Sequence, residues 1–262
     1  MLLVVDIGNT NITFGLYAGK QLIRSFRAET QPGRTSDERA AFLFQALTLY
    51  GVKPEQVTDC ILASVVPPLT DVLMLAINQV CTSLSRPPIV VGPGVKTGIA
   101  VRYDNPHDVG ADRIVNAVAA LELTKAGVIV VDFGTATTFD CVSPKAEYLG
   151  GVIAPGIEVS LEALLGRAAK LRPIELAVPP QVVGRTTAQS MQSGVVFGYA
   201  ALVDGLVTRL KGELGFPCSV IATGGLAVLI TGHTEQVERV VPELTLEGLR
   251  LIHERNLERQ SG

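Results

Sequence analysis

The sequence predicts an α/β protein made of two similar halves, and three observations support this prediction. Apolar runs of strand length alternate with helical patterns along the 262 residues, which is typical of α/β folds. The phrase VVDIGNTN near the start is followed, nearly half a chain later, by the similar phrase VVDFGTATT. An order of three strands, helix, strand and helix also occurs twice, which indicates an internal duplication. We expect two lobes, formed by residues 1–125 and 126–262.

The first half begins with three predicted strands, LLVVD, NITFGLY and KQLIRSFRAE. The first of them is nearly all apolar, so we expect it to be buried on both faces. ERAAFLFQALTLYG predicts an amphipathic helix that is ended by Gly51 and Pro54. DCILASVVP predicts a strand, LTDVLMLAINQVCTSL a helix and PPIVVG a short strand. The apolar spacing from Gly110 to Ala126 predicts another helix, stopped by Gly127.

The second half repeats this order. GVIVVDFG, ATTFDCVSP and YLGGVIAPG predict strands, VSLEALLGRAAKL a helix and PCSVIATGG a strand. A long helix is predicted from Ser190 to Leu214, and ELTLEGLRLI is an apolar, strand-like piece whose type the pattern leaves open. One face of the long helix is expected to carry Gly194, Val195, Gly198, Tyr199, Leu202 and Leu206.

Composition narrows the class of protein. Hydrophobic residues make up 47% and charged residues 18% of the chain, which indicates a globular protein with a substantial core. The formal charge of −3 provides no basic surface, so we expect neither nucleic acid nor anionic membranes as partners. The four cysteines contain no CxxC pair, and no apolar run approaches the length of a membrane span. We therefore expect a soluble, cytoplasmic protein.

Each half contains an aspartate at the end of a buried strand, followed by a turn of small polar residues. Backbone N–H groups at such a turn suit phosphate oxygens, and Asp6 can hold a hydrated Mg²⁺. One such phrase alone is more simply a hairpin with a turn glycine, whereas two together favour phosphate binding. The first acid turn contains Asp6, Ile7, Gly8, Asn9, Thr10, Asn11, Ile12 and Thr13, and the second contains Asp132, Gly134, Thr135, Thr137 and Thr138.

Two further motifs are candidates for binding. In IATGGLA, Gly224 and Gly225 follow a buried strand, and bare glycines there could lie flat against an adenosine or simply begin a helix. In GADR, Asp112 and Arg113 open a helix. The helix dipole alone could explain Asp112, but it disfavours Arg113. An anion should therefore lie near Arg113, either Asp112, Asp108 or a bound substrate.

These motifs together resemble the type III pantothenate kinase family, within the superfamily of acetate and sugar kinases, Hsp70 and actin. DIGNTN, SVVPP, VGPGVKTG, YDNPHDVGADR, VDFGTATT, GGVIAPG and ATGGLA occur in the order of that family, over nearly the full length. The resemblance implies a duplicated ribonuclease-H-like (actin-like ATPase) fold, with two lobes of mixed five-stranded sheets around a central cleft. It also implies phosphorylation of pantothenate to 4′-phosphopantothenate with ATP, the first step of coenzyme A biosynthesis.

The resemblance further implies roles for single residues. Asp112 would be the catalytic proton acceptor, Asp6 would hold Mg²⁺ through the phosphates, and Asp132 would bind a monovalent cation, K⁺ or NH₄⁺. Symmetry with Asp6 alone would instead suggest magnesium at Asp132. ATP would contact residues 6–13, Gly134, Thr135, Gly224 and Gly225, and pantothenate would contact Tyr103, Gly110, Ala111, Asp112, Arg113 and Thr187.

Some alternatives stay open at the level of sequence. Thr187 could be a helix N-cap, or Thr186 could be the cap and leave Thr187 for the substrate. The family forms homodimers, and Gly194 and Gly198 would permit a close contact between helices, although they could equally pack inside one lobe. Another small-molecule kinase, or a non-enzymatic or filament-forming actin-like protein, would share the fold. The intact segment YDNPHDVGADR argues against the filament-forming protein.

Overall fold

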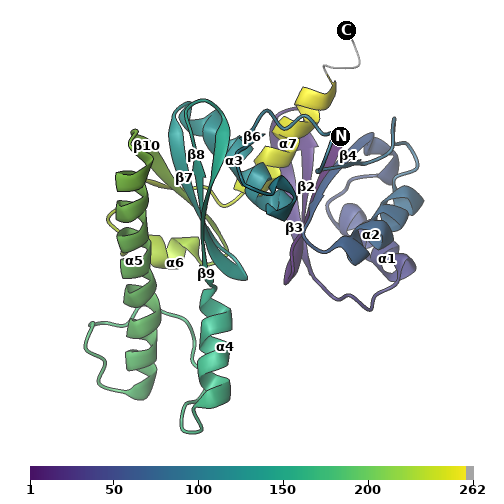
Figure 1. The fold of residues 1–262 in the computed structure, drawn as a ribbon. Helices are drawn as coiled ribbons and strands as arrows, with labels where there is room; N and C mark the ends of the chain where they lie inside the picture. The colour runs from purple at the N-terminus through teal and green to yellow at the C-terminus, as the bar shows by residue number, and fades with distance from the viewer. Residues whose placement is uncertain (258–262) are drawn as a thin grey trace. The chain divides into compact units, whose positions relative to one another are not determined.

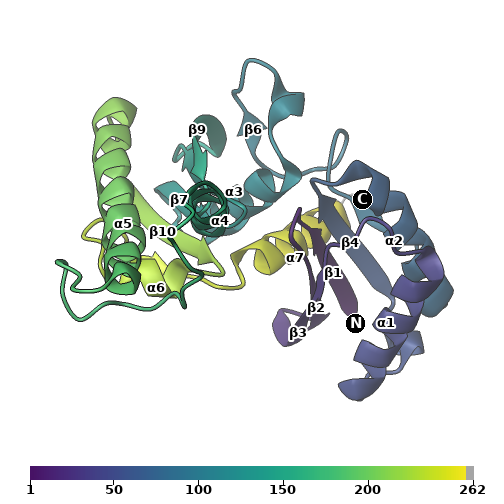
Figure 2. The same cartoon turned by 90° about the horizontal axis from the view of Figure 1, so that it is seen from below.

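The computed structural model describes residues 1–257 and divides the chain into two compact units (Figures 1 and 2). Unit 1 comprises Met1–Ile99, Asn105–Ala119 and the chain from Thr245 on. Unit 2 comprises Ala100–Asp104 and Ala120–Leu244. Both units are therefore assembled from segments that are separated in the sequence.

Unit 1 contains a five-stranded mixed sheet in the order β3-β2-β1-β4-β5. The first three strands are antiparallel neighbours, whereas β1, β4 and β5 run parallel. Its strands are β1 (Leu2–Ile7), β2 (Asn11–Ala18), β3 (Gln21–Glu29), β4 (Asp59–Ser64) and β5 (Ile89–Val90). The helices that accompany it are α1 (Ser36–Leu49), α2 (Pro67–Val80), α3 (Ala111–Thr124), which begins in unit 1 and ends in unit 2, and α7 (Leu244–Leu257).

Strand β1 is buried on both faces, as its sequence predicts. Leu3 and Val5 belong to the core cluster that contains residues of α1 and α2. Leu2 and Val4 belong to a second cluster, which contains Val115 of α3 and residues of α7. Figure 2 shows α1 and α2 on one side of this sheet and α7 on the other. The alternating side chains of the strand therefore join two helical layers.

Unit 2 contains a six-stranded sheet in the order β11-β10-β7-β8-β9-β6. The expected number was five. The additional strand, β6, pairs in parallel with the start of β9, a tertiary contact that the sequence does not reveal. The strands of this sheet are β6 (Ala100–Val101), β7 (Gly127–Phe133), β8 (Ala136–Val142), β9 (Glu147–Pro155), β10 (Cys218–Gly224) and β11 (Arg239–Val240).

Three helices, α4 (Ile157–Arg167), α5 (Thr187–Leu214) and α6 (Ala227–Thr231), contribute to the core of unit 2. The buried residues of α5 include Val196, Val203 and Val207. Gly194 and Gly198 are exposed on this helix. Figure 1 shows α4 and the adjoining part of α5 extending together beyond the end of the sheet.

The segment ELTLEGLRLI, whose type the sequence left open, is part of helix α7. Its first apolar residues, Leu244 and Leu246, are two positions apart, as in a strand, but the buried Leu249 and Ile252 follow at intervals of three. Arg250 forms ion pairs with Glu247 and Glu254 at helical spacing. The charges therefore agree with the helix, whereas the apolar pattern alone was ambiguous.

The two sheets repeat one topology. β1, β2, β3, β4 and β5 of unit 1 correspond to β7, β8, β9, β10 and β11 of unit 2. Within this correspondence Asp6 pairs with Ala63 and Asp132 pairs with Thr223, each across a parallel strand pair. The next positions, Ser64 and Gly224, are therefore equivalent in the two units.

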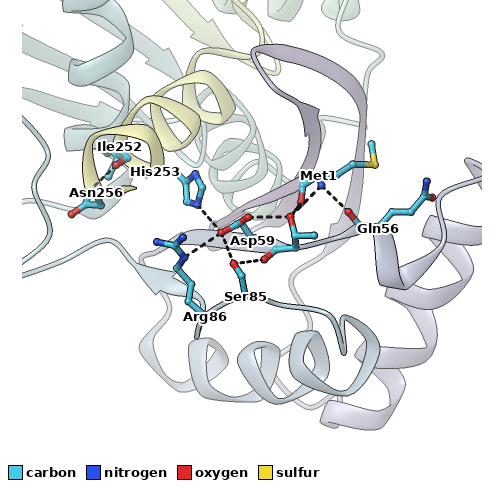
Figure 3. A network of polar contacts seen from close by, with 9 residues as sticks. Met1, Gln56, Asp59, Ser85, Arg86, Ile252, His253 and Asn256 are labelled. Carbon is cyan, nitrogen blue, oxygen red and sulfur yellow. Dashed lines mark hydrogen bonds and ion pairs between the residues drawn. The ribbon is translucent and has the colours of Figure 1, made fainter. Parts of the chain in front are cut away.

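A polar network fixes the end of β4 that is remote from Ser64 (Figure 3). The carboxylate of Asp59 accepts a hydrogen bond from Ser85 and forms an ion pair with Arg86 at 3.2 Å. Nε2 of His253, which is buried in α7, lies 3.6 Å from the same carboxylate. Burial lowers the pKa of His253 more strongly than Asp59 raises it. This network joins α7 to the sheet.

Candidate functional site

The first acid turn is the hairpin between β1 and β2. Gly8 N donates to the carbonyl of Asn11 at 3.0 Å, and Asp6 pairs with Thr13 across the strands. Asn9, Thr10 and Asn11 are exposed, whereas Ile7 and Ile12 are fully buried. The two isoleucines therefore belong to the core and add no exposed surface to this turn. The exposed amide and hydroxyl groups form the polar surface of this turn.

Thr30, which follows β3, braces the first acid turn. Its backbone N–H donates to the carbonyl of Thr10 at 2.8 Å, and its hydroxyl donates to the carbonyl of Gly8 at 2.7 Å. These bonds hold the turn from outside the hairpin and satisfy two of its carbonyls. Thr30 was not predicted, because a threonine at the end of a strand carries no motif in one sequence.

The end of β4 connects the first acid turn to the GADR motif within unit 1. Val65 N donates to the carbonyl of Ile7 at 3.1 Å. A Cβ at Gly110 would lie 3.4 Å from the side chain of Val65 and would collide with the carboxylate of Asp112. Gly110 therefore allows Asp112 to fold back toward the end of β4. The structure thus brings Asp112 and the first acid turn to the same end of the sheet, where the parallel strands β1 and β4 finish. Val65 of the SVVPP motif lies between them.

Asp112 lies in the first turn of α3, where its Oδ1 accepts a hydrogen bond from the N–H of Arg113 at 2.8 Å. Burial raises the pKa of Asp112, and the hydrogen bond and the charge of Arg113 oppose this effect. A carboxylate with a raised pKa is a stronger base than an exposed one. Arg113 is buried, with 8% of its surface exposed. The carboxylate of Asp112 interacts electrostatically with Arg113, so Asp112 is one of the anions that the sequence predicted near this arginine.

The second acid turn is the hairpin between β7 and β8. Gly134 N donates to the carbonyl of Ala136 at 3.0 Å, and Asp132 pairs with Thr138. Gly134 and Thr135 are exposed. Thr137 is fully buried, and Thr138 donates its hydroxyl to Asp140 at 3.0 Å. Of the predicted small polar residues, Gly134 and Thr135 therefore form the exposed tip.

Two glycines from other segments approach this second turn closely. A Cβ at Gly224 would lie 2.5 Å from the carbonyl oxygen of Phe133 and 2.7 Å from Oδ1 of Asp132, and its φ is +96°. A Cβ at Gly156, after β9, would collide with the carbonyl oxygens of Gly134 and Thr135. Both positions require glycine. Gly156 belongs to the quoted motif GGVIAPG but was not predicted as part of the site.

Gly225 is exposed, and no described atom lies within 4 Å of a Cβ at this position. Its bare surface is available to a ligand. The structure thus brings together Asp132, Gly134, Thr135, Gly156 and Gly224 in unit 2, with Gly225 next to them. The atoms nearest to Gly156 and Gly224 are the backbone oxygens of residues 133–135 and the carboxylate of Asp132.

Tyr103 and Thr187 are both exposed residues of unit 2. The ring of Tyr103 lies against Gly150, where a Cβ would be 3.4 Å from the ring. Thr186, not Thr187, is the N-cap of α5, because its hydroxyl accepts a hydrogen bond from Gln189 N at 3.2 Å. The hydroxyl of Thr187 is therefore not needed for the cap.

The described residues contain no group of three or more His, Cys, Asp or Glu side chains that could hold a metal ion. A strongly bound transition metal would need such a cluster. Mg²⁺ that is bound partly through phosphate, or K⁺ bound by carbonyl oxygens, does not. The donor sets of the two turns fit ions of these latter kinds.

Two sheets of one topology, each with an acid turn after its first strand, define the duplicated ribonuclease-H-like fold of actin-like ATPases and sugar kinases. A solved Baf family protein from Campylobacter jejuni has a TM-score of 0.60 at 20% identity and covers 98% of this chain and 99% of its own. A candidate N-acetylglucosamine kinase from Porphyromonas gingivalis has a TM-score of 0.54 at 12% identity, with coverages of 98% and 100%. At these identities the likeness concerns the fold.

The chain belongs to the type III pantothenate kinase family, a family of ATP-dependent kinases, whose family model matches residues 2–209. The type III pantothenate kinase of Myxococcus xanthus is 52% identical over 98% of this chain and 99% of its own length. That of Geobacter sulfurreducens is 50% identical over 98% of this chain and 100% of its own. The family predicted from the motifs is therefore confirmed.

Proposed function

We propose that the chain transfers the terminal phosphoryl group of ATP to the 4′-hydroxyl of pantothenate, which gives 4′-phosphopantothenate and ADP. This is the first step of coenzyme A biosynthesis. The observation that carries the proposal is the 50–52% identity, over 98% of the chain, to relatives named type III pantothenate kinase. The intact GADR motif beside the first acid turn agrees with it.

Asp112 is the proposed catalytic base. As the pantothenate oxygen forms its bond to the γ-phosphorus and the bond to ADP breaks, the hydroxyl proton passes to the carboxylate of Asp112. The raised pKa of this carboxyl supports the role, because it makes the carboxylate a better acceptor. Gly110, Ala111 and Arg113 are proposed to contact pantothenate around Asp112, together with Tyr103 and Thr187.

The two acid turns are proposed to contact the phosphates of ATP. In unit 1 the exposed polar groups of residues 9–11 would donate to phosphate oxygens, and Asp6 would hold a hydrated Mg²⁺. In unit 2 Gly134 and Thr135 would contact the phosphates, while Gly224 and Gly225 would lie against the adenosine. Mg²⁺ supplies compensation for the charge on the transferred group.

Asp132 is proposed to bind a monovalent cation, K⁺ or NH₄⁺. Such an ion takes several oxygen ligands of low charge. The carbonyl oxygens of Gly134 and Thr135 lie close to Gly156, and the Asp132 carboxylate lies close to Gly224. The glycines keep side chains away from these oxygens. This arrangement supports the assignment to Asp132 but not to Asp6, whose turn offers exposed amides and hydroxyls.

A homodimer is proposed, with α5 at its interface. Among the described residues α5 is long and apolar enough to cross a membrane, with a mean hydropathy of 1.3, and only 28% of its most apolar window is buried. Gly194 and Gly198 lie exposed on it, with no described atom within 4 Å of a Cβ at either position. A second copy that packs on α5 would cover this surface. We also propose that this dimer is soluble and cytoplasmic and that it binds neither membranes nor nucleic acids.

The function is tested by measuring ADP release from ATP with and without pantothenate, in the presence and absence of K⁺ or NH₄⁺. ADP release should require both pantothenate and the cation. Asp112→Asn should lower kcat by about 10²–10⁴-fold, the contribution of a general base, while ATP still binds. Asp108→Asn, an exposed carboxylate nearby in the chain, is the matched control and should retain activity.

Two results would contradict the proposal. If Asp112→Asn turns over pantothenate at the parental rate, the assigned base is wrong. If the parent releases ADP with other alcohols but not with pantothenate, the chain is a different small-molecule kinase of the same fold.

A further inference from the structure

A buried carboxylate and a buried phenol form a hydrogen-bonded pair in unit 2. Asp140 of β8 and Tyr148 of β9 are both fully buried, with 0% of their surface exposed. The hydroxyl of Tyr148 donates to Oδ1 of Asp140 at 2.7 Å, and the hydroxyl of Thr138 donates to Oδ2 at 3.0 Å. A carboxylate in such a place is costly unless it is hydrogen-bonded. The pair thus fixes the position of the Tyr148 ring.

One end of this pair leads to the second acid turn. Thr138 is the residue that pairs with Asp132 across β7 and β8, and Asp140 follows two positions later on the same face of β8. The strand between them is short and regular. Asp140 is therefore placed rigidly with respect to Asp132.

The other end leads to Tyr103. Strand β6 pairs with β9 at Val101 and Tyr148, and Arg102 N donates to the carbonyl of Tyr148 at 2.8 Å. The rings of Tyr103 and Tyr148 lie 6.3 Å apart between centroids, tilted by 56°. Such a tilted arrangement of aromatic rings is favourable. Tyr148 therefore contacts Tyr103 through its ring, and its backbone holds the two residues that precede Tyr103.

Gly150 of β9 also lies against the Tyr103 ring. Its φ is +118°, at a point where the register between β8 and β9 shifts. A Cβ at this position would lie 3.4 Å from one ring carbon of Tyr103 and 3.6 Å from another. The glycine lets the ring approach the backbone of β9 beside Tyr148.

We propose that Asp140 and Tyr148 are positioning residues, which hold the Tyr103 ring in a fixed place relative to the second acid turn and so set the affinity for pantothenate. The inference rests on the proposed contact of Tyr103 with pantothenate. Neither residue touches substrate, because both are fully buried. They act on the exposed Tyr103, and a looser ring loses part of its binding energy to ordering.

The test compares KM for pantothenate, KM for ATP and kcat in single variants of the full chain. Tyr148→Phe removes one hydroxyl and keeps the ring. It should raise KM for pantothenate about tenfold, which corresponds to about 1.4 kcal/mol, with KM for ATP and kcat close to the parental values. Asp140→Asn should also raise KM for pantothenate. If Asp140→Asn does not fold, the result for Tyr148→Phe alone decides the test.

Tyr199→Phe is the matched control. The hydroxyl of Tyr199 is also hydrogen-bonded in unit 2, to Ser160 at 2.7 Å and to the carbonyls of Pro155 at 3.1 Å and Gly156 at 3.2 Å, but it does not contact Tyr103. This variant should lose thermal stability without a selective rise in KM for pantothenate. If Tyr148→Phe behaves like Tyr199→Phe, the pair is only structural and the inference is overturned.

Tyr103→Ala separates the inference from the function on which it rests. A large rise in KM for pantothenate in Tyr103→Ala, together with a parental value in Tyr148→Phe, would refute the positioning role alone. A parental KM in Tyr103→Ala would refute the contact of Tyr103 with pantothenate, and the inference with it. In either case ADP release that depends on pantothenate would still support the kinase function.

Discussion

The two acid turns begin alike and then differ in what they expose. In unit 1 residues 8–11 join the paired strands, whereas in unit 2 residues 134–136 do so, one residue fewer. In the longer turn the carbonyl of Thr10 accepts a hydrogen bond from the N–H of Thr30. The shorter turn is instead approached by Gly156 and Gly224, which lie against backbone oxygens. The first turn exposes the side chains of Asn9, Thr10 and Asn11, whereas the second exposes Gly134 and the single side chain of Thr135.

This difference is one way in which a duplicated fold could hold the two kinds of ion proposed for it. The aspartates of the two turns occupy equivalent positions, beside Ala63 in unit 1 and Thr223 in unit 2. The position after these, however, is Ser64 in unit 1 and Gly224 in unit 2. A side chain is accommodated at the first and excluded at the second. The surroundings therefore distinguish Asp6 from Asp132, although the strands do not.

The largest effect on stability is expected from Gly224→Ala. Its Cβ would meet the carbonyl of Phe133 at 2.5 Å, and its φ of +96° disfavours any side chain, so strain of about 1–3 kcal/mol or more should lower the thermal unfolding midpoint. At the equivalent position Ser64→Ala removes hydrogen bonds with Val66 and Thr70 and should cost about 1 kcal/mol.

Gly225→Ala is the control for this comparison, because no described atom lies within 4 Å of the new Cβ. Its unfolding midpoint should match that of the parent. Equal losses of stability in Gly224→Ala and Gly225→Ala, measured by calorimetry, would show that the close approach to the second turn is not what requires glycine.

A smaller effect on stability is expected at the opposite end of the unit 1 sheet, in the network around Asp59 at the start of β4. Burial lowers the pKa of His253, so the folded state favours the neutral imidazole. Above about pH 6.5 the histidine is neutral in both states, and the stability is fully present. As the pH falls below this value, the unfolded chain takes up the proton more readily, and the free energy of unfolding decreases.

His253→Gln should remove this part of the pH dependence, a change within about 1 kcal/mol, in denaturant unfolding at pH 7 and pH 5.5. His107→Gln, at an exposed position, is the control and should unfold like the parent. Because the network lies at the remote end of β4, kcat should not change. A loss of activity in His253→Gln at pH 7 would contradict this expectation and would show that the network around Asp59 affects catalysis.

Much of the fold could be predicted from the sequence, because its long strands and helices have clear periods. The two-residue β11 was not predicted, and the five-residue α6 was only an open alternative, as a helix that Gly224 and Gly225 could begin. The placement of β6 in the second sheet depends on its pairing with β9, a tertiary contact that leaves no local signal. Segment α7 begins with an alternation typical of a strand.

The candidate site divides in the same way. Motif residues such as Asp6, Asp132 and Gly224 could be chosen from the sequence because turns and strand ends have recognisable residues. Thr30 and Asp140 could not, since each acts through a partner distant in the chain or on another strand. The choice between Thr186 and Thr187 as the cap required the geometry of α5.

The proposed binding of different ions by the equivalent aspartates is tested most directly by a crossed titration. The activity of Asp6→Asn and Asp132→Asn is measured while Mg²⁺ is varied at saturating K⁺, and then the reverse. Asp6→Asn should need about 10–100-fold more Mg²⁺ with a parental response to K⁺. Asp132→Asn should need more K⁺ by a similar factor, with a parental response to Mg²⁺. If both variants shift the requirement for the same ion, the assignment of different ions to the two turns is wrong.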